Sequence, residues 1–286
     1  MSLQDSVGFL GSPGSYSHQA ASRLRPNSEP VGFETFDKLI SAVEQGDVEE
    51  AVLPLENSTS GRIPDIHRLV VSMELYIIEE LLLDVNHCLV SSEVVELNTV
   101  EAILSHPQGF VQSAEFLKRN LSKASKRQRS DTATAVKEAV NGRDGKIVAI
   151  GSEFAANYYN GVVLNRNISD RDDNITRFAL LSREAKTSDS NDVTSMILQV
   201  DHRPGSLVRA LSVFGKHDVN ITKLETYMIS DKTVLPTFYL DIGCGSHDEK
   251  LVMALKELKG SITYSKFLGS YKSDEKRNGR NGFLKP

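Results

Sequence analysis

The sequence predicts an α/β protein with a two-lobed domain over residues 6–182, followed by a smaller α+β domain of ferredoxin-like order over 194–271. Three observations predict this arrangement. Short apolar runs alternate with amphipathic helical segments through the first part of the chain, which is typical of mostly parallel sheets covered on both faces. Polar and charged residues fill 183–193, the composition of a linker. Beyond it the predicted elements follow the order β-α-β-β-α-β.

The first lobe is predicted to begin with a strand at 7–10, which leads through the glycine loop GSPGS at 11–15 into a helix at 17–24. Thr35 caps a second helix, which ends at Gly46. The other elements expected in this lobe are strands at 31–33, 51–55, 76–83 and 87–90 and a helix at 63–71.

The same alternation predicts a second lobe. Its expected elements are a strand at 100–104, a helix that turns Phe110, Ala114 and Leu117 inward, a helix opened by residues 131–134, a strand at 147–150, a helix at 152–159 and a returning strand at 178–181. Two such lobes leave a cleft between them, and ligands of such sheets gather at the carboxyl ends of the strands.

The smaller domain is expected to contain strands at 194–200, 220–228, 235–242 and 262–268. Its helices are expected after Gly205 and at 250–258. The segment 272–286 is charged and rich in Gly and Asn, so we expect a disordered tail there.

Composition narrows the classes of function. The 286 residues carry a formal net charge of −5, so no basic excess favours nucleic acid or an anionic membrane, and small molecules or copies of the chain are the expected partners. The two cysteines, Cys88 and Cys244, give no disulfide framework, and His, Cys and acidic residues show no metal spacing. The N-terminus shows no signal peptide and no apolar run reaches membrane-spanning length, so the sequence predicts a cytoplasmic protein without a bound metal.

Polar clusters follow several predicted strands, where a ligand of such a fold would bind. The clusters are Ser15-Tyr16-Ser17, Glu56-Asn57-Ser58, Ser105-His106-Pro107-Gln108, Asp131-Thr132-Ala133 and Asn174-Ile175-Thr176-Arg177-Phe178. The last cluster joins an amide, a hydroxyl and a guanidinium, which suits a site that holds an anion and releases a hydroxyl group from it. The glycine spacing at 11–15 fits neither a dinucleotide fingerprint nor a P-loop.

Each cluster also has a structural interpretation. Residues 56–58 have the composition of a capped turn, and Asp131 that of a helix cap, although a helix start also offers free N–H groups to a carboxylate. His106 could titrate near neutral pH or only bond a backbone group. Arg177 could bind a substrate carboxylate or pair with Asp172 or Asp173.

Taken together and in this order, these five motifs resemble the prephenate dehydratase family with a C-terminal ACT regulatory domain. The resemblance covers about 7–271 of the chain. It implies two lobes like those of periplasmic binding proteins, with the catalytic cleft between them. It also implies conversion of prephenate to phenylpyruvate, with loss of water and carbon dioxide, in phenylalanine biosynthesis, and no cofactor.

The resemblance assigns roles to individual residues. Thr176 corresponds to the essential threonine, expected to donate a hydrogen bond to the leaving hydroxyl. Arg177 and the helix starts near Ser17 and Thr132 are expected to bind carboxylates. The full set expected to contact substrate is Ser17, Glu56, Asn57, Ser58, Ser105, His106, Gln108, Thr132, Ala133, Asn174, Arg177 and Phe178.

The C-terminal unit resembles an ACT domain, which in this family binds phenylalanine at a subunit interface and inhibits the enzyme. The residues expected to contact the effector are Gly205, Ser206, Leu207, Val208, Asn220, Ile221 and Glu225. The family usually continues Glu-Ser-Arg-Pro after the second motif, whereas this chain has Glu225-Thr226-Tyr227-Met228. We therefore expect phenylalanine to regulate the enzyme and the chain to form a homodimer or homotetramer through this domain. The alternative is that the domain has lost the effector and mainly dimerises.

Three functions remain open from the sequence. The first is the regulated prephenate dehydratase, and the second is the same fold acting on arogenate, the amino analogue of prephenate. No motif separates these two. The third is a catalytically silent module that binds a small anion between its lobes.

Overall fold

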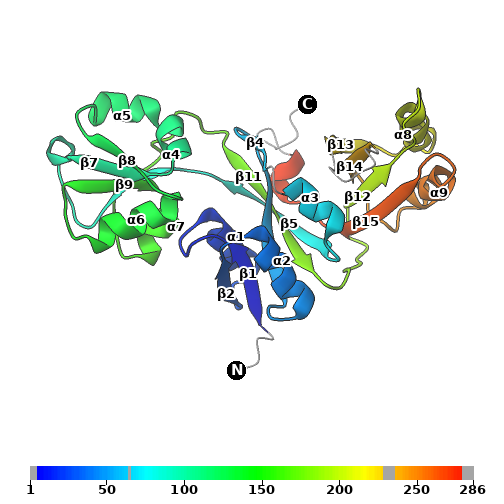
Figure 1. Cartoon of the computed structure of the whole chain (residues 1–286), viewed down its shortest axis with the longest axis horizontal. Helices are drawn as coiled ribbons and strands as arrows, with labels where there is room; N and C mark the ends of the chain where they lie inside the picture. The colour runs from blue at the N-terminus through cyan, green and yellow to red at the C-terminus, as the bar shows by residue number, and fades with distance from the viewer. Residues whose placement is uncertain (1–4, 64–65, 228–235, 279–286) are drawn as a thin grey trace.

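The computed structural model describes residues 5–63, 66–227 and 236–278. Three parts lie in a row along the long axis of the molecule (Figure 1): the second lobe at one end, the first lobe in the middle and the C-terminal domain at the other end. The two lobes and the ferredoxin-like unit predicted from the sequence are therefore all present.

The first lobe is built on one sheet with strand order β2-β1-β3-β11-β5, and β4 pairs with β3. Its elements are β1 (Ser6–Leu10), α1 (Tyr16–Leu24), β2 (Glu29–Phe33), α2 (Phe36–Gln45), β3 (Glu50–Asn57), β4 (Gly61–Arg62), α3 (Ile66–Ser72), β5 (Tyr76–Asp84) and β11 (Ile175–Ser182). Strand β1 runs parallel to β2 and β3, whereas β11 runs antiparallel to β3 and β5. The expectation of mostly parallel sheets is wrong here, because the chain returns from the second lobe through β11.

The second lobe has a sheet of order β10-β6-β9-β7-β8. Its elements are β6 (Cys88–Ser91), η1 (Leu97–Thr99), β7 (Ala102–Ser105), α4 (Pro107–Gln112), α5 (Ala114–Asn120), β8 (Ser125–Gln128), α6 (Thr132–Asn141), β9 (Ile147–Gly151), α7 (Glu153–Tyr158) and β10 (Val162–Asn165). This sheet is also mixed, since β7 is parallel to β8 and β9 while β6 is antiparallel to β9 and β10.

Two strands of the second lobe escaped prediction. Strand β8, with the sequence SKRQ, is exposed at every position and lacks any apolar residue, so no hydrophobic pattern marks it. The other unpredicted strand, β10, forms one edge of the same sheet. The single helix expected around 110–117 is two helices that meet at Ser113. Ala114 is consequently exposed instead of inward, whereas Phe110 and Leu117 are buried as expected.

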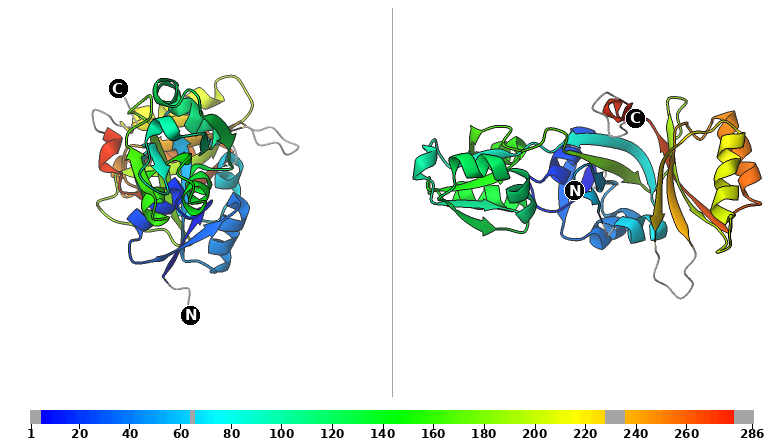
Figure 2. Two further views of the ribbon diagram at one scale, coloured as in Figure 1. Left: turned by 90° about the vertical axis from the view of Figure 1, so that its left-hand side faces the viewer. Right: turned by 90° about the horizontal axis from the view of Figure 1, so that it is seen from above.

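The C-terminal domain has the sheet order β13-β14-β12-β15. Its elements are β12 (Val193–Gln199), α8 (Ser206–Lys216), β13 (Ile221–Tyr227), β14 (Thr237–Ile242), α9 (Glu249–Leu258) and β15 (Tyr264–Tyr271). Both helices cover the outer face of the sheet (Figure 2), where Phe214 and Leu251 pack with Leu240. The expected strand ends at 228 and 235 lie outside the described residues.

The inner face of this sheet packs directly on the first lobe. Ile197, Tyr239 and Tyr271 share one hydrophobic cluster with Leu53 and Ile77 of the first lobe. A continuous apolar core across a domain boundary fixes the two parts relative to each other more firmly than a linker alone would.

Helix caps set the positions of the loops that face the second lobe. The hydroxyl of Ser15 accepts from the backbone N–H of His18 at the start of α1, and the carboxylate of Asp131 accepts from that of Thr134 at the start of α6. Such caps satisfy N–H groups that have no partner within the helix. The expected capping roles of Thr35 and Gly46 on α2 are also confirmed.

The C-terminal segment contradicts the expected disordered tail over 272–278. Asp274 accepts the backbone N–H of Leu82 in β5 at 3.0 Å, and a short 3₁₀ helix follows, η2 (Glu275–Asn278). Arg277 is 4% exposed and pairs with Glu80 and Asp241. Composition alone predicted disorder, but a buried arginine between two carboxylates orders the segment; residues 279–286 lie outside the described part.

Removing residues 273–286 should therefore destabilise the protein. The truncation leaves the buried carboxylates of Glu80 and Asp241 without Arg277, and losing one member of a buried ion pair typically costs about 3–5 kcal/mol. Removing only 279–286 keeps Arg277 and serves as the control for loss of the chain terminus as such. Urea denaturation of both variants measures the difference, and equal stabilities would show that the Arg277 contacts contribute nothing.

Candidate active site

Two of the predicted motifs meet where β3 ends and β11 begins. Thr176 lies opposite Asn57 in the antiparallel register of these strands. The side-chain amide of Asn57 donates to the Asn174 carbonyl oxygen at 2.7 Å and to the Thr176 hydroxyl at 2.9 Å. Residues 117 to 119 positions apart thus form one contact group, as expected for residues at a shared strand end.

A loop holds the Asn57 amide in one orientation. The backbone N–H groups of Thr59 and Ser60 donate to the Asn57 side-chain oxygen at 3.0 and 2.9 Å. Because a backbone N–H can only donate, this oxygen is the acceptor and the amide nitrogen must face Asn174 and Thr176. The loop after β3 therefore makes the Asn57 amide the donor and the Thr176 hydroxyl the acceptor in their contact.

Further polar side chains extend this group across both lobes. Gln112, at the end of α4 in the second lobe, donates to the Thr59 hydroxyl at 3.3 Å, and its oxygen lies 2.7 Å from Nε2 of His87. The Tyr16 hydroxyl lies 3.3 Å from Nδ1 of His87. We call Asn57, Thr59, Gln112, Asn174 and Thr176 the amide–hydroxyl cluster.

The set of expected substrate contacts omits Gln112, Thr59, His87 and Tyr16, although Tyr16 belongs to one of the polar motifs. Gln112 lies one helical turn beyond Gln108, and Thr59 follows the predicted Asn57-Ser58 pair directly, so helical spacing and loop length could have pointed to both. His87 carries no comparable signal, because it enters from the crossover after β5, whereas Tyr16 enters from the first turn of α1.

One donor in the cluster has no protein partner. Asn174 is 3% exposed, and its side-chain nitrogen makes no hydrogen bond although the atom is buried. A buried polar atom without a partner costs about 1–3 kcal/mol, so it requires an explanation such as a ligand that binds there.

The glycine loop and the start of α6 also come together between the lobes. Ser12 donates to the carboxylate of Asp131 at 3.2 Å and lies 3.2 Å from the Thr134 hydroxyl. Tyr159, the residue that follows α7, donates to the backbone oxygen of Pro13 at 2.6 Å. Thr132 and Ala133 lie at this contact, but the Asp131 carboxylate already takes the Thr134 N–H group.

The other predicted side chains occupy mixed positions. Ser17 lies half-buried in the first turn of α1, and Gln108 is exposed on α4. His106 caps α4 by accepting the backbone N–H of Gln108, not by bonding a carbonyl. Ser58 donates to the Asp173 carbonyl and accepts from the Ile175 N–H, so it ties the start of β11 to the loop after β3.

The interpretation of Arg177 as a substrate ligand is wrong. Its guanidinium is 2% exposed and pairs with Glu80, Asp241 and Glu56 at 2.8, 2.7 and 3.1 Å. Burial alone would lower the pKa of Arg177, but attraction to Asp241 and other neighbours outweighs it and raises the pKa well above its usual range. The side chain joins the C-terminal domain to the first lobe, and its burial keeps the guanidinium from a substrate carboxylate.

Glu56, Phe178 and Ser105 also depart from the expected substrate contacts. Glu56 is paired with Arg177 and with Lys223 of β13. Phe178 is 1% exposed and packs with Phe9 in the core under α1. Ser105 is fully buried, with its hydroxyl toward the Ile150 carbonyl. Phe178 and Ser105 are therefore inaccessible to a ligand, and Glu56 is committed to two cationic side chains.

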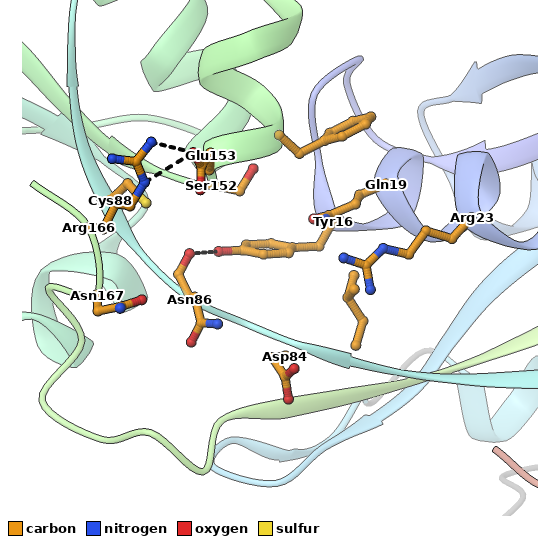
Figure 3. A pocket seen from close by; sticks show the side chains of 12 residues that line it. Tyr16, Gln19, Arg23, Asp84, Asn86, Cys88, Ser152, Glu153, Arg166 and Asn167 are labelled. Atoms are coloured by element: carbon orange, nitrogen blue, oxygen red, sulfur yellow. Dashed lines mark hydrogen bonds and ion pairs between the residues drawn. The ribbon is translucent and has the colours of Figure 1, made fainter. Parts of the chain in front are cut away.

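A separate cavity of about 190 Å³ lies between the lobes beside the crossover segments. Figure 3 shows Tyr16 pointing into it from α1, with Asn86 and Arg166 opposite. The Tyr16 hydroxyl donates to the backbone oxygen of Asn86 at 2.9 Å. Tyr16 also contacts His87, which in turn contacts Gln112 of the amide–hydroxyl cluster.

Within 5–63, 66–227 and 236–278, no group of three or more His, Cys, Asp or Glu side chains could hold a metal ion. The helices in these ranges include none with the length and apolar composition needed to cross a bilayer.

The family becomes clear when this geometry is set beside known proteins. The family model for prephenate dehydratase matches residues 7–186, which is more than half of the chain. The chain belongs to the prephenate dehydratase family. A second family model, for the ACT domain, matches residues 194–260. The chain is thus a lyase of phenylalanine biosynthesis with a C-terminal ACT domain, as the sequence predicts.

Individual relatives of this prephenate dehydratase family member cover most of its length. The bifunctional chorismate mutase/prephenate dehydratase of Enterobacter agglomerans is 34% identical over 94% of this chain and 70% of that protein. Arogenate dehydratase 2 of Petunia hybrida is 34% identical over 94% of this chain and 72% of that protein. A solved structure of GqqA, described as a novel type of quorum quenching acylase, is 31% identical with a TM-score of 0.87, covering 95% of this chain and 99% of that one.

The predicted effector residues lie at two ends of the ACT sheet. In register, Ile221 faces Ile242 while Tyr227 faces Thr237, and the loop with Gly205 and Ser206 follows the end of β12 near Thr237. At about 3.3 Å per residue, the length of β13 separates the two motifs by roughly 20 Å. One chain of this prephenate dehydratase family member therefore does not bring Asn220 and Ile221 to the Gly205 loop.

A cavity lies beside the effector motif that begins at Gly205. It has a volume of about 380 Å³ and is lined by Ser206 and Leu207 of the first motif together with Phe238. Val208 is 67% exposed in the first turn of α8. Glu225, in the second motif, pairs with Lys223 at 3.2 Å.

Proposed function

We propose that the enzyme converts prephenate to phenylpyruvate and that Thr176 donates a hydrogen bond to the departing hydroxyl. The observation that supports this proposal most directly is that the Thr176 hydroxyl acts as an acceptor toward Asn57. Its oxygen accepts from the Asn57 amide, whose orientation is set by the backbone N–H groups of residues 59 and 60. The single proton of the Thr176 hydroxyl therefore stays available to a ligand.

The proposed reaction needs little from the protein beyond positioning and hydrogen bonding. Prephenate loses its carboxylate as carbon dioxide while the ring hydroxyl departs, and the electron pair of the broken carbon–carbon bond completes the aromatic ring. Aromatisation drives the step, so no covalent intermediate is required. A hydroxyl is a poor acid but a good donor, and one preorganised donor contributes about 3 kcal/mol to such a barrier.

The other unpartnered donors favour an anionic substrate at the same place. The buried side-chain nitrogen of Asn174 donates to no protein acceptor. The side-chain nitrogen of Gln112 makes a single contact, with Thr59. With Arg177 committed to protein carboxylates, we assign carboxylate binding to these amides and to the helix start near Ser17. Neutral donors hold a carboxylate without placing a second charge beside the leaving group.

Arogenate is the alternative substrate, and a relative of equal identity bears that name. The two compounds differ in one oxo or amino group, so the ratio of kcat/KM for prephenate and arogenate decides between them. We expect prephenate to be preferred, and a ratio in favour of arogenate would replace the proposed substrate. A silent binding module predicts no turnover of either compound.

Acylase activity is a further alternative because GqqA bears that description. Acyl transfer by a hydroxyl requires a nearby base to take its proton. The Thr176 hydroxyl accepts from the Asn57 amide, which donates and cannot act as that base. We therefore expect no hydrolysis of an N-acyl amide under conditions that give full turnover of prephenate.

We further propose that phenylalanine inhibits the enzyme through a homodimer or homotetramer of ACT domains in the cytoplasm. A second chain would bring Asn220 and Ile221 of one subunit to the Gly205 loop of the other. Strand β13 is an edge strand of the sheet and exposes Leu224, which suits such pairing. Light scattering with and without phenylalanine tests this, and a monomer under both conditions would contradict the arrangement.

A further inference from the structure

His87 occupies an unusual place for a residue outside every predicted motif. It lies in the crossover after β5, is 2% exposed, and contacts Gln112 on one ring nitrogen and Tyr16 on the other. Burial lowers the pKa of His87, and the hydrogen bond with Gln112 raises it only in part. At neutral pH the ring is therefore neutral and carries one N–H group.

The contact with Gln112 selects which nitrogen carries that proton. Nε2 lies 2.7 Å from the side-chain oxygen of Gln112, and an oxygen of an amide can only accept. Nε2 is therefore protonated and Nδ1 is not. The Tyr16 hydroxyl donates to the Asn86 oxygen at 2.9 Å and lies 3.3 Å from Nδ1.

The same contact accompanies the orientation in which the Gln112 oxygen faces His87 and its nitrogen faces the amide–hydroxyl cluster. With its oxygen held by His87, Gln112 presents its nitrogen to Thr59. One N–H bonds Thr59, and the second makes no hydrogen bond within the described part of the chain. The cluster then offers donors from Thr176, Asn174 and Gln112, which suits negative charge that develops on a departing oxygen.

We propose that His87 is a positioning residue that orients the Gln112 amide so that its N–H groups face the substrate. This inference rests on the proposed dehydratase function, because it assigns the donors to the leaving hydroxyl or a substrate carboxylate. Without His87 the amide can rotate by half a turn and present its oxygen instead. An acceptor at that place repels the same charge that the donor stabilises.

A direct role of His87 in proton transfer fits the geometry less well. A chain of hydrogen bonds leads from its ring to Thr176 through Gln112, Thr59 and Asn57. A general acid needs its proton within hydrogen-bond reach of the reacting atom, or one water away. His87 acts through Gln112.

Substitution of His87 tests the proposal by kinetics. In His87→Leu we expect kcat for prephenate to fall about tenfold to thirtyfold, since the loss is that of one oriented hydrogen bond. In His87→Gln the amide nitrogen can replace Nε2 as donor, and we expect at least a threefold recovery of kcat, measured beside the thermal midpoint of each variant. If His87 had a purely structural role, kcat would fall in step with the thermal midpoint, and His87→Gln would not recover kcat.

A double-mutant cycle separates the route through Gln112 from general damage. In a Gln112→Leu background, His87→Leu should reduce kcat by less than about twofold, because the residue through which His87 acts is gone. Losses that multiply would overturn the proposal. Gln45→Leu, an exposed position on α2, serves as the background control, in which the full effect of His87→Leu should remain.

The tautomer gives a readout independent of turnover. Nitrogen-15 NMR of the His87 ring in the full chain should show a protonated Nε2 and an unprotonated Nδ1. The opposite tautomer would overturn the inference even if the enzyme is fully active. The expected tautomer in a protein without prephenate turnover would instead reject the proposed function while leaving the orientation of Gln112 intact.

Discussion

Replacing Thr176 by alanine should lower kcat for prephenate by about 10²-fold to 10³-fold, the usual loss when one preorganised donor to a developing oxyanion is removed. The substitution deletes the Thr176 hydroxyl. In the wild type this hydroxyl accepts from Asn57, so its own proton can be donated to the substrate. It affects the step in which the hydroxyl departs, so KM should change much less than kcat. Steady-state kinetics with prephenate measure both constants.

Thr176→Ser is the matched control for this prediction. Serine keeps the hydroxyl and the Asn57 contact and removes only a methyl group, so most of the activity should remain. Near-normal kcat in Thr176→Ala, with the fold intact by circular dichroism, would reject the role of Thr176. Equal losses in both variants would show that packing, and not the hydroxyl, matters at this position.

The second large effect is expected for Asp241→Ala, which should reduce the free energy of unfolding by about 3–5 kcal/mol. Asp241 is fully buried in β14 and pairs with Arg177 at 2.7 Å and Arg277 at 2.8 Å. Ser195 and Tyr239 also donate to its carboxylate. The substitution leaves two buried guanidinium groups with one carboxylate, Glu80, in common.

Urea denaturation measures this loss, with Asp201→Ala as the control at an exposed carboxylate. The control should change stability by less than about 0.5 kcal/mol. A similar value for Asp241→Ala would mean that the buried pairs contribute nothing across the domain boundary.

The stability difference between wild type and Asp241→Ala should also depend on pH. Burial alone would raise the pKa of Asp241, but the attraction of Arg177 and Arg277 outweighs it and lowers the pKa. A carboxylate with a lowered pKa stabilises the fold above its unfolded value of about 3.9 and loses that contribution as pH falls below it. The difference should be constant above about pH 5 and shrink in more acidic solution.

Much of the architecture follows from local signals in the sequence. The strand–loop–helix start at 7–24, the capped helix after Thr35 and the ferredoxin-like order of the C-terminal domain each carry a period or a cap that sequence alone displays. Asn57, Asn174 and Thr176 were expected near strand ends, and the antiparallel pairing of β3 with β11 places them together.

The errors share a physical cause, because each depends on a contact between distant segments. Arg177 looked accessible beside Thr176, but successive residues of a strand point to opposite faces, and its face is covered by Asp241 of another domain. The segment at 272–278 has a disordered composition, yet one arginine finds two buried carboxylates. Strand β8 has no apolar residue and forms only because β7 pairs with it.

The assay that tests the central proposal most directly is turnover of prephenate by the wild-type chain and by Thr176→Ala and Thr176→Ser, followed through the appearance of phenylpyruvate. Rapid formation by the wild type, retention in the serine variant and loss in the alanine variant is the expected result. No phenylpyruvate from the wild type, or equal rates in all three proteins, would contradict a dehydratase that relies on the Thr176 hydroxyl.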